Sequence, residues 1–442
     1  MNPKACLLTV LAVSCSAVVS IAQEAAFQKL SAQATDLYRQ AKYADAARVG
    51  REALQVAEKT FGPSHREVAT ALGNLAEYER ALGDYTEAEV VDKRALLLDE
   101  KLLGPEHPDV AVDLNNLAML YDSLGRYADA EPFYNQALEI DQRTLGPDHP
   151  DVATDLNNLA EAYRAQGKLT EADPFLRRAL AIWEKQPTPN PRAMATVLSN
   201  LGALTAARGN NTEAEQYLTQ ALEKWRQAVG AGHPSIAATL RTLGSVQAAL
   251  HEYSKAETSY TQALAIDEKS TDKKASQEQA GDLTRLGLLL FQEKKYAAAE
   301  ARFQRALSLD EAVHGKDQSS VASAANNLAE VYRAEGKYKQ AEPLYQRAVL
   351  IDENVLGPHH PDLANDLNNL GALYFSEGRY ADAESTLKRA LAIKQDAFGP
   401  NDPKLLPVLD NYAIVLRALK RTADAAAIDA RVKDIRANSA KP

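Results

Sequence analysis

The chain has 442 residues with a formal net charge of −10 at pH 7, and 45% of its residues are hydrophobic. That much apolar material is enough to build a core, so a wholly disordered chain is excluded. The acidic balance argues against a protein that coats nucleic acid or binds an anionic membrane surface.

The first 22 residues have the pattern of a secretory signal peptide. Lys4 gives a positive start, residues 5–22 are uncharged, and Ser20-Ile21-Ala22 places small residues before a cleavage point. This pattern predicts export with cleavage after Ala22. Two alternatives stay open. One is an uncleaved anchor, for which this uncharged stretch barely suffices. The other is a lipoprotein signal with Cys15 as the lipidated residue.

Cys6 and Cys15 are the only cysteines, and both lie in this segment. Cleavage would leave a chain without a disulfide, a thiolate nucleophile or a cysteine zinc site. A large exported protein without disulfides favours a bacterial periplasm or cell exterior. We therefore expect a periplasmic or secreted protein, which would meet a membrane only through an uncleaved signal or a lipidated Cys15.

From residue 23 onward the sequence repeats with a period of 42 residues. The phrase Asp-Leu-Asn-Asn-Leu begins at Asp113, Asp155 and Asp366. A period in this range is typical of solenoids, in which each unit buries its apolar face against its neighbours. Ten units would fill residues 23–442 and leave no room for an appended enzyme domain. The second Asn of the phrase marks one position in each unit, which we call the anchor. Successive anchors lie 42 residues apart, except for one step of 43 after Thr242. The ten anchors are Ala32, Asn74, Asn116, Asn158, Asn200, Thr242, Arg285, Asn327, Asn369 and Asn411.

Each unit is predicted to contain two antiparallel helices. In the third unit, residues 114–124 carry apolar side chains at helical spacing, and Gly125 supplies a left-handed end. A second helical stripe begins at Tyr127 and is stopped by Gly146-Pro147, because glycine caps a helix and proline cannot continue it. Pro150 then suits the first turn of the next helix.

Two small positions recur seven residues apart in the second helix of each unit. A side chain limited to one methyl group at such a position predicts close approach of the helices, so these residues are expected to be structural. The first set is Ala46, Ala88, Ala130, Ala172, Ala214, Ala256, Ala299, Ala341, Ala383 and Ala425; the second is Ala53, Ala95, Ala137, Ala179, Ala221, Ala263, Ala306, Ala348, Ala390 and Val432.

These features together resemble the tetratricopeptide repeat. The 42-residue length, the Leu-Asn-Asn-Leu-Ala phrase, the Tyr-x-x-Ala-Glu run and the Gly-Pro-x-His-Pro linker are similar to the long repeats of kinesin light chains and their bacterial relatives. A kinesin light chain itself is not expected, since heptad coiled coil precedes the repeats in that family. The resemblance implies an all-α fold, a right-handed solenoid of about ten helix-turn-helix units.

The units are not uniform, which divides the chain into four expected parts. These are the signal peptide (1–22), repeats one to four (23–185), degenerate middle repeats (186–282), and repeats seven to ten with a C-terminal cap (283–442). The middle part includes the polar run 268–282 with the extra residue. We expect a weaker interface, and therefore a flexible joint, near 268–282.

The anchor positions give the candidate binding site. An amide offers donors and an acceptor, so a row of asparagines on a concave face can pair with the main chain of an extended peptide. In similar repeats, equivalent asparagines hold peptide backbone. Arginines further along the same helices favour carboxylates, which suggests an acidic ligand. The candidate residues are Asn74, Asn116, Asn158, Asn200, Asn327, Asn369 and Asn411, with Arg80, Arg164, Arg333 and Arg417.

Structural roles for these residues are equally open. An asparagine between helices can fix the stacking angle by bonding to the preceding unit. Arginines of this kind are more often solvated surface than ligand contacts.

Three classes of function remain from the sequence. The first is a non-catalytic scaffold that binds a protein or an extended peptide in the groove. The second is a structural or self-associating part of an envelope assembly. The third is an enzyme on a solenoid, which we do not expect, because no catalytic or phosphate-binding motif is present. No cofactor or metal is expected, and the recurring linker histidines are too far apart to share an ion.

Overall fold

The computed structural model describes residues 22–269 and 273–439, and every regular element within these ranges is a helix. The helices form ten consecutive pairs, as the period predicts, and consecutive helices pack on one another within residues 43–207 and within residues 234–439. The first helices are residues 22–39, α3 (Arg66–Leu82), α5 (Pro108–Ser123), α7 (Pro150–Ala165), α9 (Pro191–Ala207), α11 (Pro234–Ala249), α13 (Lys273–Gln292), α15 (Ser319–Ala334), α17 (Pro361–Ser376) and α19 (Leu406–Ala418), the last preceded by the 3-10 helix η1 (Pro403–Leu405). The second helices are α2 (Tyr43–Phe61), α4 (Tyr85–Leu103), α6 (Tyr127–Thr144), α8 (Leu169–Lys185), α10 (Asn211–Val229), α12 (Tyr253–Asp267), α14 (Tyr296–His314), α16 (Tyr338–Leu356), α18 (Tyr380–Phe398) and α20 (Thr422–Ser439).

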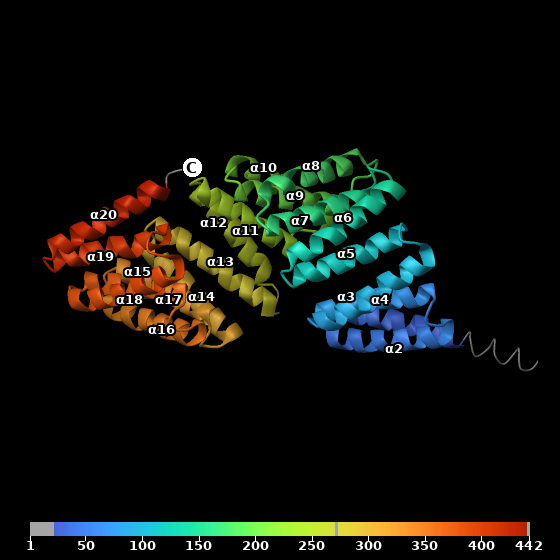
Figure 1. Cartoon of the computed structure of the whole chain (residues 1–442), viewed down its shortest axis with the longest axis horizontal. Coiled ribbons are helices and arrows are strands. Elements are labelled where there is room, and N and C mark those ends of the chain that lie inside the picture. Colours follow the sequence, from blue (N-terminus) through green and yellow to red (C-terminus); the bar gives the residue numbers. More distant parts are fainter. Residues whose placement is uncertain (1–21, 270–272, 440–442) are drawn as a thin grey trace, which may run out of the picture. The chain divides into compact units, whose positions relative to one another are not determined.

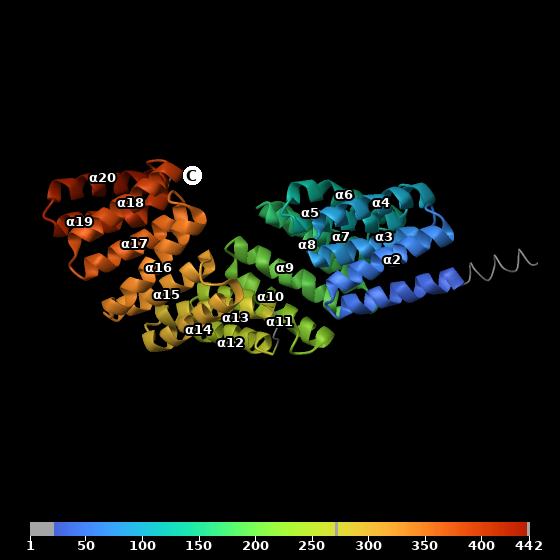
Figure 2. The same ribbon diagram turned by 90° about the horizontal axis from the view of Figure 1, so that it is seen from below.

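The chain divides into two compact units, Met1–Ala228 and Val229–Pro442. Within the first, the helices from α2 to α8 stack in chain order (Figure 1). Within the second, α13 to α20 do the same (Figure 2). The joint expected at 268–282 falls within the second unit, and its residues 270–272 lie outside the described residues. The signal segment also lies outside them, apart from Ala22, so the joint and the export signal stay predictions.

The linkers between pairs are held by histidine caps. In the Gly-Pro-x-His-Pro linker, Gly146 adopts φ +94°, and His149 Nδ1 accepts a hydrogen bond from the backbone N–H of Asp151 at 3.2 Å. A side-chain acceptor at this place satisfies one of the unpaired N–H groups at a helix start. His65, His107, His233 and His360 cap α3, α5, α11 and α17 in the same way. Capping therefore accounts for the recurrence of these histidines.

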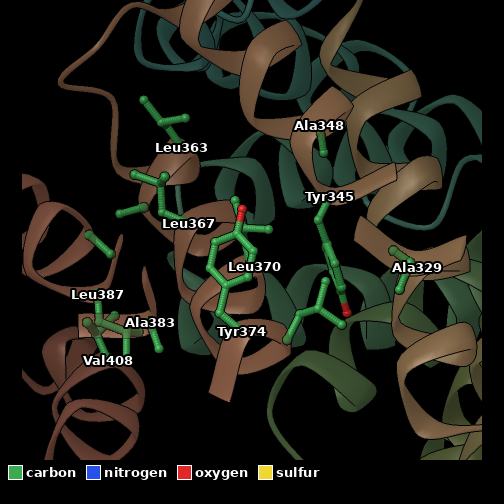
Figure 3. Packing of buried hydrophobic residues seen from close by; sticks show 14 of the residues in the cluster. Ala329, Tyr345, Ala348, Leu363, Leu367, Leu370, Tyr374, Ala383, Leu387 and Val408 are labelled. Atoms are coloured by element: carbon green, nitrogen blue, oxygen red, sulfur yellow. The ribbon is translucent and has the colours of Figure 1, made fainter. Parts of the chain in front are cut away.

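The small positions in the second helices lie in the core, as predicted. The alanines of both sets are at most 3% exposed, and Val432 is 7% exposed. In the second unit, Ala383 and Ala348 belong to one buried cluster with Tyr345, Leu370 and Leu387 (Figure 3). Larger side chains from the first helices fill the space that each alanine leaves, so a methyl group is the size that these contacts require.

Substitution of Ala383 by leucine is expected to destabilise the protein by about 1–3 kcal/mol, because the added atoms would overpack a fully buried contact. Ala392 lies on the same helix, α18, but is exposed, so Ala392→Leu is a matched control. Urea denaturation followed by circular dichroism measures both variants. An equal loss in both would contradict the proposed packing role.

Within each unit the first helices form the inner face. The pairs α3 with α5, α7 with α9, α15 with α17 and α17 with α19 are in direct contact, whereas the second helices of neighbouring pairs make no comparable contact in the described residues. A stack in which one layer approaches more closely than the other curves toward that layer. We call the exposed side of the first helices the inner face.

Candidate functional site

The candidate asparagines lie on the first helices, but their side chains are engaged differently. Asn200, Asn369 and Asn411 each donate a hydrogen bond to the side-chain oxygen of an asparagine in the preceding repeat, at 3.0, 3.3 and 2.9 Å. Asn158 accepts a bond from neighbouring Asn157 at 3.4 Å. These hydrogen bonds join consecutive repeats, which is the structural role that the sequence left open for the asparagines. Both partners in each bond are side chains. The side chains of Asn74, Asn116 and Asn327 make no hydrogen bond within the described residues.

The four candidate arginines all have partners. Arg80 is the most enclosed, at 13% exposure of its side chain, and donates to the backbone oxygen of Asn116 at 2.7 Å and to Asp92 at 3.4 Å. Arg164 pairs with Glu161, Arg333 with Glu330, and Arg417 with Asp429. Because each guanidinium already contacts a carboxylate, these residues give the inner face no excess of positive charge.

Two cavities bring candidate residues together. In the first unit, a cavity of about 520 Å³ is lined by Asn74, Asn116 and Arg80. The exposed side chains of Val112 and Met119 lie beside them in the same lining. In the second unit, a cavity of about 450 Å³ is lined by Arg333, Asn369 and Asn411, together with Phe375 and Ile414. The other candidates line neither cavity: Asn158, Asn200, Asn327, Arg164 and Arg417.

Sequence reasoning missed a set of buried aspartate pairs. Asp113, Asp155, Asp366 and Asp282 stand three residues before the anchor position on a first helix, and each contacts an aspartate at the end of the preceding second helix. The sequence did contain a signal for these pairs. The Asp of the repeated phrase recurs with the period, at a position where a buried carboxylate is costly. The pairs are Asp99 with Asp113, Asp141 with Asp155, Asp352 with Asp366, and Asp267 with Asp282.

Burial perturbs these carboxyl groups. Desolvation, followed by repulsion from Asp99, raises the pKa of Asp113 to about 8. Desolvation and the nearby Asp352 raise the pKa of Asp366 to about 8. Burial also raises the pKa of Asp155 to about 7, against the lowering effect of the Asn115 hydrogen bond. A carboxyl group whose pKa is raised in this way favours one proton shared with its neighbour over two negative charges side by side.

Three of the pairs receive a donor from the preceding first helix. Asn115 donates to Asp155 at 2.6 Å, and Asn326 donates to Asp366 at 2.7 Å. Arg241 does the same with a guanidinium, which reaches Asp267 at 2.8 Å and Asp282 at 3.5 Å. All three donors occupy the position directly before the anchor. This position, rather than the anchor itself, links one repeat to the carboxyl pair of the next.

The described residues contain no group of three or more His, Cys, Asp or Glu side chains arranged to hold a metal ion. Among them there is also no helix with the length and apolarity needed to cross a membrane.

Comparison with known proteins identifies one family for all matched parts of the chain. A family model described as tetratricopeptide repeat matches residues 26–96, 68–143, 123–185, 193–269, 280–349, 320–396 and 367–438. A search of curated proteins finds no match.

The three similar solved structures given below are each under 25% identical, and the two with a TM-score above 0.5 bear on the fold alone. A signal transduction ATPase with a tetratricopeptide repeat sensor from Pyrococcus horikoshii is 17% identical, with a TM-score of 0.60 over 80% of this chain and 52% of that one. The quorum sensor NprR from B. thuringiensis is 15% identical, with a TM-score of 0.54 over 74% of this chain and 87% of that one. Kinesin light chain repeats from Podosopora anserina are 23% identical, with a TM-score of 0.40 over 45% of this chain and 95% of that one.

Proposed function

The chain belongs to the tetratricopeptide repeat family, and on that premise we propose that it is an exported, non-catalytic scaffold that binds an extended peptide of a partner protein along its inner face. Tetratricopeptide repeats support protein interaction, because stacked helix pairs present a long continuous surface. Three parts of this proposal go beyond what the family supports: the extended peptide as ligand, the site on the inner face, and the export.

One observation carries the binding site. Asn74 and Asn116 line the same cavity of the first unit, and their side chains have no hydrogen bond within the described residues. Val112 and Met119, which are 56% and 47% exposed, flank them. Amides beside exposed apolar side chains suit a peptide, whose backbone needs hydrogen-bond partners and whose side chains need contact area.

The double variant Asn74→Ala/Asn116→Ala is expected to weaken peptide binding about thirtyfold, since it removes two amides of about 1 kcal/mol each. Its melting temperature should not change. The full chain is first screened against an array of extended peptides, and the tightest peptide is titrated by fluorescence anisotropy.

Asn200→Ala is the matched control in the same unit, because Asn200 bonds to Asn157 and lines neither cavity. It should lower the melting temperature and leave peptide affinity unchanged. Wild-type affinity in the double variant would contradict the proposed site.

The export is tested separately from the binding. Protein recovered from the exported fraction of a bacterial host is expected to begin at Gln23, by N-terminal sequencing, because Ala22 precedes the proposed cleavage point. Retention of the full sequence in the cytosolic fraction would contradict export.

A self-associating assembly subunit is the second candidate. Val90 and Leu97 on α4 are 60% and 67% exposed and lie seven residues apart, on one side of the helix. Exposed apolar side chains in a row favour contact with another copy or another protein. Sedimentation velocity across a range of concentrations tests self-association, and a single monomer species throughout would exclude it.

A further inference from the structure

The position directly before the anchor decides how each buried aspartate pair is satisfied. Asn115, Arg241 and Asn326 occupy it in three repeats, and each donates to an aspartate of the next carboxyl pair. In the second repeat the position is Gly73, on α3. Glycine has no side chain, so the Asp99–Asp113 pair receives no donor from the preceding first helix.

The Asp99–Asp113 pair, of which Asp113 is buried and Asp99 half-buried, lacks the donor that the other three pairs receive. Asp113 is 8% exposed, and Asp99 Oδ1 and Asp113 Oδ2 have only one another as partners, with no donor from another side chain. A buried acceptor without a donor costs free energy, so this pair offers a strong site for an incoming cationic donor.

A second repeat of the same chain shows which donor fits such a pair. On α11, Arg241 takes the place that Gly73 takes on α3, and its side chain is 12% exposed. Its guanidinium contacts Asp267 at 2.8 Å, Glu278 at 3.1 Å and Asp282 at 3.5 Å. By register with the anchors, these three acids correspond to Asp99, Asp109 and Asp113.

Arg241 lines a cavity of about 470 Å³ in its repeat and places a guanidinium against the carboxyl pair, whereas Gly73 has no side chain to do so. A Cβ atom built on Gly73 meets no heavy atom within 4 Å, and Gly73 lines the cavity of about 520 Å³ described above. The carboxyl groups in its lining are Glu77, Asp99, Asp109 and Asp113, against the guanidinium groups of Arg66 and Arg80.

Neither of these arginines fills the space. Arg80 is held by Asn116 and Asp92, and Arg66, with 71% of its side chain exposed, reaches only Asp109 at 3.5 Å. The cavity is therefore acidic as well as open.

We propose that the Gly73 cavity binds the guanidinium group of an arginine side chain in the partner peptide, held by Asp99 and Asp113 as Arg241 is held by Asp267 and Asp282. This inference rests on the proposed function and gives it a specificity: an extended peptide with an arginine. The guanidinium donates to both carboxylates and displaces the proton between them. The aliphatic stem of the arginine lies against Val112 and Met119.

The test uses the full chain, in EDTA, with two probes. The first is methylguanidinium, observed by saturation-transfer NMR, which reports the cavity without a peptide. The second is a capped, fluorescent Gly/Ser peptide with a central arginine, compared with the same peptide carrying citrulline, which keeps the shape and removes the charge.

Gly73→Arg is the decisive variant, because it would supply from within the chain the group that the ligand supplies. We expect saturable binding of the arginine peptide, at least about tenfold weaker binding of the citrulline peptide, and a loss of both methylguanidinium and arginine-peptide binding in Gly73→Arg. Gly73→Ala is the matched control and should bind like wild type, since its methyl group enters open space.

Several results would overturn the inference. These are equal affinity for the arginine and citrulline peptides, equal binding by Gly73→Arg and wild type, or, in a separate titration without EDTA, saturable Ca²⁺ binding without guanidinium binding. Methylguanidinium binding as tight as that of the peptide would overturn the peptide source in favour of a small guanidinium compound. If peptides of the array bind whether or not they contain arginine, this inference is wrong and the proposed function still holds. Methylguanidinium bound at Gly73 while no peptide binds would contradict the proposed function and, with it, the peptide as the source of the guanidinium.

Discussion

Substitution of Arg241 by alanine is expected to destabilise the second unit by about 3–5 kcal/mol at pH 8. The guanidinium contacts Asp267, Asp282 and Glu278, and the side chains of the two aspartates are 6% and 0% exposed. Its removal leaves buried carboxylates facing one another without a counter-charge, which is the costliest way to break a buried ion pair.

The loss should be smaller at pH 5. Burial raises the pKa of Asp282 to about 7 even with Arg241 present, so in the variant the aspartates can take up a proton and avoid the repulsion. Urea denaturation at the two pH values measures the difference, and hydrogen exchange locates the opening to α11–α13.

Arg285→Ala is the matched control for Arg241→Ala. Arg285 stands on α13 in the next repeat, is 40% exposed, and reaches only Asp282, at 3.4 Å. Because its guanidinium is solvated, Arg285 is expected to contribute at most about 1 kcal/mol, although Asp282 is buried. If the two variants lose equal stability, or if Arg241→Ala loses as much at pH 5 as at pH 8, the central role of Arg241 is wrong.

The second large effect is a loss of stability as the pH rises from 5 to about 8.5. The folded-state pKa is about 8 for Asp113 and Asp366 and about 7 for Asp155, whereas an unfolded aspartate titrates near 3.9. A folded-state pKa above the unfolded value gives a stabilisation that is complete below the unfolded pKa. It is lost as the pH rises through the folded pKa, by about 1 kcal/mol per pH unit for each proton that only the folded chain keeps.

The variant Asp113→Asn/Asp366→Asn should flatten this dependence. Each amide can donate to the partner carboxylate, Asp99 or Asp352, without a shared proton, so the variant is expected to be more stable than wild type at pH 8.5. Asp396→Asn is the control, because Asp396 is exposed on α18. Thermal melts across the pH range test all three proteins. A wild-type stability that rises toward pH 8.5, or parallel curves for wild type and the double variant, would contradict the shared-proton account.

The fold could be predicted from the sequence because it is set by local, repeated signals. The 42-residue period, the glycines at helix ends and the two alanine positions each describe one repeat and its contact with the next. In a solenoid a residue meets only neighbouring repeats, so a pattern read in one unit holds in the others. The buried alanines and the ten helix pairs follow from this directly.

The candidate site was predicted only in part. The sequence places Asn74 and Asn116 on one face, and the structure puts both in one cavity with Arg80. The sequence does not tell which amides are already engaged, and Asn200, Asn369 and Asn411 are bonded to the preceding repeat. Whether an amide is available depends on the partner that the adjacent helix presents, which lies about 43 residues away in the chain.

The sequence by itself therefore determined the repeat, the helices and the row of positions that a ligand could meet. Only the tertiary structure decided where charge is buried and where space is left. Gly73 and Arg241 hold the same place in the period and both line cavities, yet only Arg241 supplies a guanidinium to the neighbouring carboxyl pair. The reason is physical: burial, pairing and empty volume belong to contacts between helices, and the period fixes where those contacts occur without fixing what fills them.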